Sequence, residues 1–186
     1  MGRWPVSGKE AQTVMSTMKR FAGIFPAIIS IMIFVTTSAA EEEQHLSAIA
    51  LKTKMIVEAT YKYTEEHSEN MDTVQYAIQH DPRFLDIDNE LYIFIHCYDV
   101  QKREAVCCGQ AVRPELIGKN MWSLRTPNGR LLFYEIAQMI ERDGEGWIEY
   151  DWLNPYSNRI QTKRSYVKGI ILKDGRKAWI GSGYWK

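Results

Sequence analysis

The densest group of reactive side chains lies between His96 and Cys108. Cys97, Cys107 and Cys108 join His96 there, and sulfur and imidazole nitrogen are the ligands that zinc prefers. The group lacks C-x-x-C spacing, and adjacent cysteines rarely both bind one ion, so a zinc site is disfavoured. In an oxidising compartment Cys97 can pair with Cys107 or Cys108, and the odd count then leaves one thiol. Opposed strand residues often suit a disulfide poorly. We therefore favour three buried small residues and leave their disulfide state open.

Lys163 is the residue most suited to holding an anion. It lies in the segment Lys163-Arg164-Ser165-Tyr166-Val167, where strand alternation points it the same way as Ser165 and Val167. A lysine is ordinarily a solvated surface charge. If the ammonium faces inward, a ligand carboxylate would satisfy it through a charge-assisted hydrogen bond of about 1.5–3 kcal/mol. Lys163 is thus a candidate for binding small acids.

Aromatic residues at a spacing of two could form the walls of such a site. Tyr150 and Trp152 share one strand face, and Tyr92 and Phe94 share another with His96. Core packing is the alternative for each of them, while apolar walls with few polar groups are typical of small-ligand sites. We expect His96 to be a sheet histidine whose hydrogen bonds are satisfied.

No pattern in the chain indicates catalysis. Glu149 and Asp151 could be posed as an acid and base pair, but alternation places them on the face away from Tyr150 and Trp152. The sequence has no Gly-rich phosphate loop, no G-x-S-x-G and no H-E-x-x-H. We predict a protein that is not an enzyme, with no catalytic residues, no metal and no cofactor.

The elements that position these residues follow from periodicity and turn chemistry. Helical spacing of apolar residues runs from Gln44 to about Glu66, and Asn70 or Asp72 begins a short helix that ends at Asp81-Pro82. Alternation, apolar runs and turns predict one more helix, which begins near Leu131, and five strands: 91–98, 104–108, 146–153, 160–172 and 177–184. The order fits an α+β domain, in which a five-stranded antiparallel sheet carries a long N-terminal helix on one face.

The first forty residues resemble a targeting segment. Lys19-Arg20, an apolar stretch over 21–35 and small residues up to Ala40 are the three parts of a secretory signal peptide. We therefore expect residues 1–17 to be an N-terminal extension, 18–40 a signal peptide and 41–186 one domain. The protein would then be periplasmic or secreted. The alternative is a membrane anchor by an uncleaved signal, although the apolar stretch is short of the roughly 20 residues of a spanning helix.

The charge balance bears on partners. Residues 1–40 hold four basic residues and one acidic residue of the 23 of each in the chain, so the remainder has 19 basic and 22 acidic residues, a net of −3. No basic stripe is present, so we expect no nucleic-acid partner.

Several segments in order resemble a single Cache domain, the extracytoplasmic sensor domain of chemoreceptors and sensor kinases. They are 91–95, 114–120, 127–129, 146–155, 163–168 and 180–184. The resemblance covers nearly all of 41–186. It implies a PAS-like fold with a ligand pocket on the sheet face opposite the long helix, roofed by the loop after the second strand. One segment departs: Val106-Cys107-Cys108-Gly109 stands where many members have an Ala-His-Gly-like sequence.

The resemblance also implies a function. We expect an exported sensory domain that binds a small carboxylate or an amino-acid-like metabolite through Lys163, Tyr150, Trp152, Tyr92 and Phe94. Because the sequence ends directly after the last strand, we expect a stand-alone member without a transducing module, which would act through a membrane-bound signalling partner. The alternative is an envelope adaptor domain with no small-molecule ligand.

Overall fold

The computed structural model describes residues 25–186, with side chains from residue 43 onward. The chain divides into two compact units, Met1–Ser47 and Ala48–Lys186, and the predicted site lies in the second. The predicted extension 1–17 and residues 18–24 of the predicted signal peptide lie outside the described residues. Within residues 25–186 no helix has both the length and the apolar character needed to cross a membrane.

Three α-helices occur in the described part of the chain: α2 (Phe25–His67), α3 (Met71–His80) and α4 (Leu132–Asp143), together with the 3-10 helix η1 (Pro114–Leu116). Helix α2 was predicted to begin at Gln44, but it begins at Phe25. The difference arises because residues 18–40 were expected to be a signal peptide, so no helix of the domain was predicted there. Of the two predicted cap candidates, Asn70 caps α3, since its Oδ1 accepts hydrogen bonds from the backbone N–H groups of Asp72 and Thr73.

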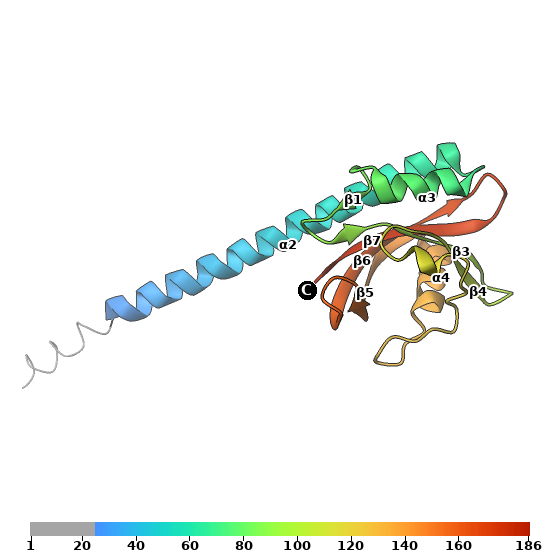
Figure 1. The fold of residues 1–186 in the computed structure, drawn as a ribbon. Helices are drawn as coiled ribbons and strands as arrows, with labels where there is room; N and C mark the ends of the chain where they lie inside the picture. Colours follow the sequence, from blue (N-terminus) through green and yellow to red (C-terminus); the bar gives the residue numbers. More distant parts are fainter. Residues whose placement is uncertain (1–24) are drawn as a thin grey trace, which may run out of the picture. The chain divides into compact units, whose positions relative to one another are not determined.

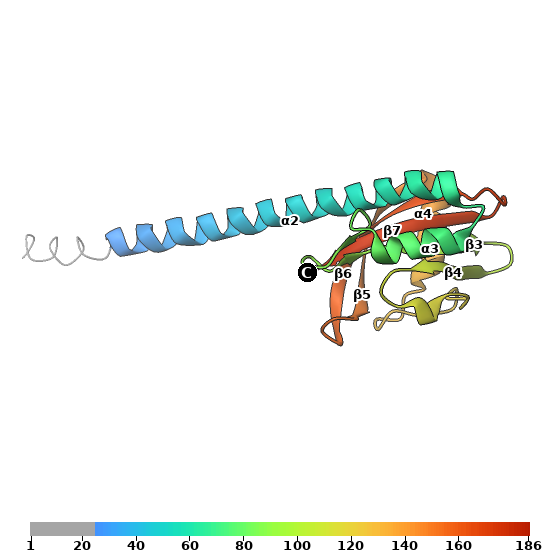
Figure 2. The same ribbon diagram turned by 45° about the horizontal axis from the view of Figure 1, so that its top comes forward.

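The predicted five-stranded antiparallel sheet is confirmed. Its spatial order is β4-β3-β7-β6-β5, and every neighbouring pair is antiparallel. The strands are β3 (Phe94–Asp99), β4 (Glu104–Gln110), β5 (Glu145–Asn154), β6 (Arg159–Ile171) and β7 (Lys177–Trp185). Residues 48–67 of α2 lie with α3 on one side of the sheet, and α4 lies on the other (Figures 1 and 2).

The predicted strand 91–98 is in fact two strands. β2 (Leu91–Tyr92) pairs with β1 (Leu85–Asp86), a short strand that was not predicted, whereas β3 pairs with β4 and β7. Ile93, between β2 and β3, accepts a backbone hydrogen bond from Ala111 at 3.0 Å. All residues of the run 91–98 are buried, so hydropathy alone carries no sign of the change of partner.

Cys97 and Cys107 are buried as expected, whereas Cys108 is only partly buried. Cys97 and Cys108 form a disulfide, and only Cys107 is a buried free thiol among the described residues. The reason is a β-bulge: Ile95 pairs with Gly109 and His96 with Cys107, so Cys108 is the extra residue. The bulge changes the direct opposition that the sequence argument assumed. The disulfide also takes up two of the four side chains that the zinc alternative needs as ligands.

Turns close the elements around α4 and β7. Gly144 ends α4 with a φ of 78°, and its N–H donates to the Ile140 carbonyl at 2.9 Å. Gly175 has a φ of 84° in the tight connection between β6 and β7. These left-handed conformations favour glycine at both positions. The main apolar core lies between α4 and the sheet, around Phe133, Ile136 and Trp179.

Candidate functional site

A small cavity of about 40 Å³ lies between the sheet and α4, on the face opposite α2. Its lining includes all five residues predicted to bind a ligand, which are Tyr92, Phe94, Tyr150, Trp152 and Lys163. They come from four strands, β2, β3, β5 and β6. A buried water needs roughly 10–15 Å³ of such space. The cavity therefore has room for about three waters, or for a ligand of a few heavy atoms.

Lys163 is the charged residue of the cavity, and its side chain is only 1% exposed. Strand pairing places it opposite Tyr150 on β5 and Trp185 on β7. The side chain faces α4 because Ser165 and Val167, which alternate with it, are buried on the same face. Of the two orientations that the sequence left open for Lys163, the structure has the inward one.

Aromatic rings surround the Lys163 ammonium. Its Nζ lies 3.7 Å from the ring centroid of Tyr92, 4.7 Å from that of Trp185 and 5.6 Å from that of Phe94. Cation–π contacts of this kind can stabilise a desolvated cation by about 2 kcal/mol. Within residues 43–186 no carboxylate forms an ion pair with Lys163. The ammonium is thus held by ring faces, and its hydrogen-bonding capacity is left for another group.

Burial sets the protonation of the cavity. Desolvation lowers the pKa of Lys163 well below the ordinary lysine value, and the more distant carboxylate of Glu90 opposes this only in part. Desolvation also raises the pKa of Tyr150 to about 12 and the pKa of Tyr92 further still, so both phenols keep their protons. The Tyr150 hydroxyl is 3.0 Å from Ser165 Oγ, and either oxygen can be the donor.

His96 does not fit the expectation of a satisfied sheet histidine. It is buried, it lines the cavity, and its Nδ1 has no hydrogen-bond partner among the described residues. Its ring instead stacks on Trp179, with centroids 5.5 Å apart. Complete burial lowers the pKa of His96 to about 3, so the imidazole is neutral near pH 7. A neutral imidazole offers one donor and one acceptor to a ligand.

Several further lining residues were not predicted. Three come from α4 and three from β4 and the segment that follows it: Leu132, Phe133, Ile136, Gln110, Leu116 and Met121. The helical periodicity of 131–140 could have placed the α4 residues on one apolar face. Gln110, Leu116 and Met121 carry no such signal, because a loop that folds over a pocket has no period. They form the roof that the family resemblance implied.

The fold is a PAS-like α+β domain with a small cavity between the sheet and α4. Comparisons with known proteins agree with this class. The family model dCache_2, described as "Cache domain", matches residues 28–174. The match covers most of the chain, so the chain belongs to the Cache domain family of sensory domains.

Solved structures with the same fold include chemotaxis proteins. A chain described as "Periplasmic sensor domain of chemotaxis protein" is 24% identical with a TM-score of 0.54, and the match covers 79% of this chain and 96% of that one. A methyl-accepting chemotaxis protein from Vibrio parahaemolyticus is 18% identical with a TM-score of 0.59, covering 79% and 95%. A Cache chemosensory domain described in terms of carboxylic acid recognition is 19% identical with a TM-score of 0.53, covering 80% and 95%. These likenesses concern the fold.

Proposed function

We propose that this chain is an extracytoplasmic sensory domain that binds a small carboxylate in the cavity between α4 and the sheet, and that it performs no chemistry of its own. The observation that carries the proposal is Lys163. Its ammonium is buried, faces the cavity and lacks an anionic partner among the described residues. An isolated buried charge is costly, and a carboxylate in the cavity would offset that cost. The carboxylic acid recognition described for one structural neighbour supports the same ligand class.

The lining favours simple acids over amino acids. The ammonium group of an amino acid would need an anionic or strongly accepting partner, and the lining residues within the described part of the chain include no aspartate or glutamate. The remaining polar groups, on Tyr92, Tyr150, His96 and Gln110, are uncharged donors or acceptors. The cavity volume of about 40 Å³ favours an acid of two or three carbons. Ligand binding would be passed on through a membrane-bound signalling partner.

The test compares acids with neutral molecules of the same shape. Acetate and propionate, acetamide and propionamide, and a panel of amino acids are screened by thermal shift on the purified chain. A ligand at about one hundred times its Kd stabilises the fold by about 2.7 kcal/mol, which raises the Tm by several degrees for a domain of this size. We expect stabilisation by the acids and none by the amides.

Two variants locate the effect. Lys163→Met should abolish the acid response, because it removes the cation and keeps most of the apolar stem. Lys168→Met, a change on the same strand at a lysine that is ion-paired with Glu58, should keep the response. Equal responses to acids and amides would contradict the carboxylate assignment. No response to any ligand would favour the adaptor alternative, in which the cavity is merely a packing void.

A further inference from the structure

A second feature, separate from the cavity, surrounds the Cys97–Cys108 disulfide. An open hollow of about 830 Å³ lies over the β3–β4 hairpin, the end of α4 and the β6–β7 turn, and its lining includes Cys97 and Arg176. Cys97 is 6% exposed, whereas Cys108 is only partly buried. The disulfide is therefore at the edge of the core, and Cys108 is the more exposed of its two residues.

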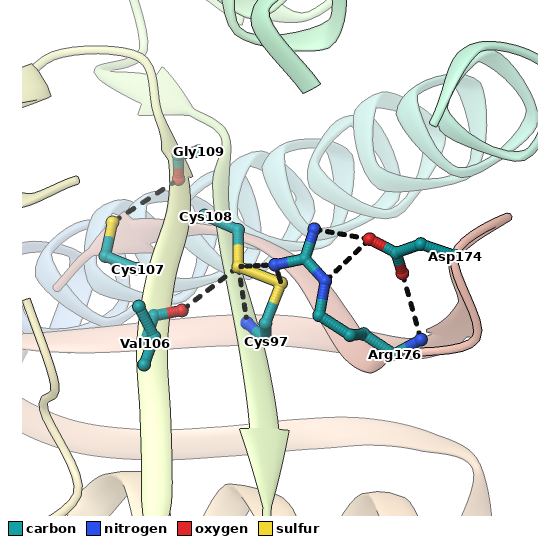
Figure 3. Close-up of a disulfide and its surroundings, with 7 residues drawn as sticks. All are labelled: Cys97, Val106, Cys107, Cys108, Gly109, Asp174 and Arg176. Carbon is teal, nitrogen blue, oxygen red and sulfur yellow. Dashed lines mark hydrogen bonds and ion pairs between the residues drawn. A yellow bond between two sulfur atoms is a disulfide. The ribbon is translucent and has the colours of Figure 1, made fainter. Parts of the chain in front are cut away.

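Arg176 places a positive charge against the two sulfurs. Its Nε and Nη2 hold the Asp174 carboxylate at 2.7 and 2.6 Å, which leaves Nη1 directed at the disulfide (Figure 3). Nη1 lies 3.5 Å from Cys97 Sγ and 3.9 Å from Cys108 Sγ. The backbone N–H of Cys97 also points to Cys108 Sγ, at 3.1 Å. A thiolate released at Cys97 would lie beside the Arg176 cation, and a neighbouring cation lowers the pKa of a thiol.

We propose that the Cys97–Cys108 disulfide is a thiol-exchange site, at which external thiols open the bond by attack on Cys108 and Cys97 leaves as a thiolate beside Arg176. The thiolate of the incoming molecule forms a new S–S bond with Cys108 Sγ. The Cys97–Cys108 bond breaks, and its electron pair stays on Cys97 Sγ. A lower leaving-group pKa speeds such exchange, and access decides which sulfur is attacked.

A second thiol completes the reduction. It attacks the external sulfur of the mixed disulfide, the external disulfide is released, and Cys108 takes up the proton that the second thiol gives up. The Val106 carbonyl, 3.3 Å from Cys108 Sγ, is placed to accept a hydrogen bond from the new thiol. Two external thiols are oxidised and one protein disulfide is reduced, so the electrons balance.

Cys107 supplies an internal control. Its side chain is buried, and desolvation raises the pKa of the thiol to about 11, so little thiolate is present near pH 7. It should resist alkylation in the folded chain, while Cys97 and Cys108 react after exchange. The Cys107→Ala variant removes any reshuffling through this third sulfur and serves as the background for the kinetic test.

The experiment uses the oxidised, folded chain and 2-mercaptoethanol, a neutral thiol that the charged hollow does not attract. Samples are quenched with acid, alkylated and mapped by peptide mass spectrometry. We expect the mixed disulfide on Cys108 and the alkyl label on Cys97, without denaturant. Arg176→Gln should slow exchange by about threefold to tenfold, since it removes the cation beside the leaving sulfur. The matched change Lys102→Gln, in the same hollow at an exposed lysine paired with Asp99, should leave the rate within about twofold.

Other outcomes would overturn the proposal. They are free thiols at Cys97 and Cys108 in the oxidised chain, exchange only in denaturant, a mixed disulfide on Cys97, or an Arg176→Gln rate equal to that of the unchanged chain. A circular dichroism spectrum unchanged in Arg176→Gln shows that the slower rate does not arise from misfolding. Because the test needs no carboxylate ligand, its result is independent of the function proposed above.

Discussion

Strand β6 carries two buried or half-buried lysines whose surroundings differ: one has a carboxylate partner and the other does not. Lys168 faces α2, where its Nζ lies 2.8 Å from Glu58 Oε2 and 3.6 Å from Glu145 Oε2. Lys163 faces α4, where it meets aromatic rings and, among the described residues, no carboxylate. The hydrogen bond with Glu58 raises the pKa of Lys168, whereas desolvation lowers the pKa of Lys163. One lysine is satisfied within the fold and the other is not.

The difference separates the structural face of the sheet from the face with the cavity. On the α2 side, charges are paired at the edge of the contact between α2 and β6 and each is partly exposed. On the α4 side, a single cation lies deep in an apolar wall. Such a charge lowers the stability of the fold, and a ligand that pairs with it would offset that cost.

Lys163→Met should make the unliganded protein more stable while removing acid binding. Replacing buried charged groups by apolar side chains of similar volume is often stabilising, by about 1–4 kcal/mol. Urea unfolding without ligand measures the stability, and calorimetric titration measures the binding. A less stable variant would mean that Lys163 is a structural residue.

Gly181→Ala should disturb the aromatic cage, by which we mean the rings of Tyr92, Phe94 and Trp185 around the Lys163 ammonium. A Cβ at residue 181 would come within 2.3 Å of the Phe94 ring and 2.9 Å of Val167, so the ring must move. Overpacking of this kind costs about 1–3 kcal/mol of stability, and we expect acid binding to weaken with it. Denaturant unfolding and titration test both effects. A matched Ala178→Gly change in the same strand should lower stability without moving Phe94, and it should therefore keep its affinity for the acid. If Gly181→Ala also kept its affinity, the role of the cage would be contradicted.

Acid affinity should fall as pH rises. The carboxylate favours the ammonium form, so binding raises the lowered pKa of Lys163 and the complex takes up protons. Affinity is lost as pH rises through the pKa of the free form. In the unliganded fold the sign is reversed: the unfolded chain binds more protons, so stability rises with pH from that lowered pKa up to the ordinary lysine value. Titration in two buffers of different ionisation enthalpy measures the uptake, and none should occur with Lys163→Met.

Lys168→Met should change stability by no more than about 1 kcal/mol, as is typical of partly exposed ion pairs. The effect should shrink at high salt, because exposed pairs are screened. Urea unfolding at low and high salt checks both statements. A loss of stability larger than that caused by Gly181→Ala would show that the ion pair of Lys168 is not a minor contribution of the α2 face.

Much of this arrangement follows from local sequence patterns. Alternation placed Tyr150, Trp152 and Lys163 correctly, because a strand of period two leaves only two directions for a side chain. Turn chemistry gave the helix cap at Asn70 and the hairpin glycine at Gly175. These features depend on a few neighbouring residues, which is why one sequence suffices for them.

Features that depend on distant partners were missed. The break between Tyr92 and Phe94 is a change of strand partner, and the bulge at Cys108 is a mismatch in register with β3. Neither leaves a mark on hydropathy. The missing partner of His96 Nδ1 is likewise a property of the assembled core. Depth of burial and absent partners, which distinguish Lys163 from Lys168, become visible only once the sheet is formed.

The decisive measurement is a crystal structure of the chain grown with propionate, which is located by difference electron density. We expect the acid in the cavity between α4 and the sheet, with a carboxylate oxygen within about 3 Å of Lys163 Nζ, the length of a charge-assisted hydrogen bond. Propionate density elsewhere, or an unoccupied cavity at saturating acid, would contradict the role of Lys163 as the ligand's partner.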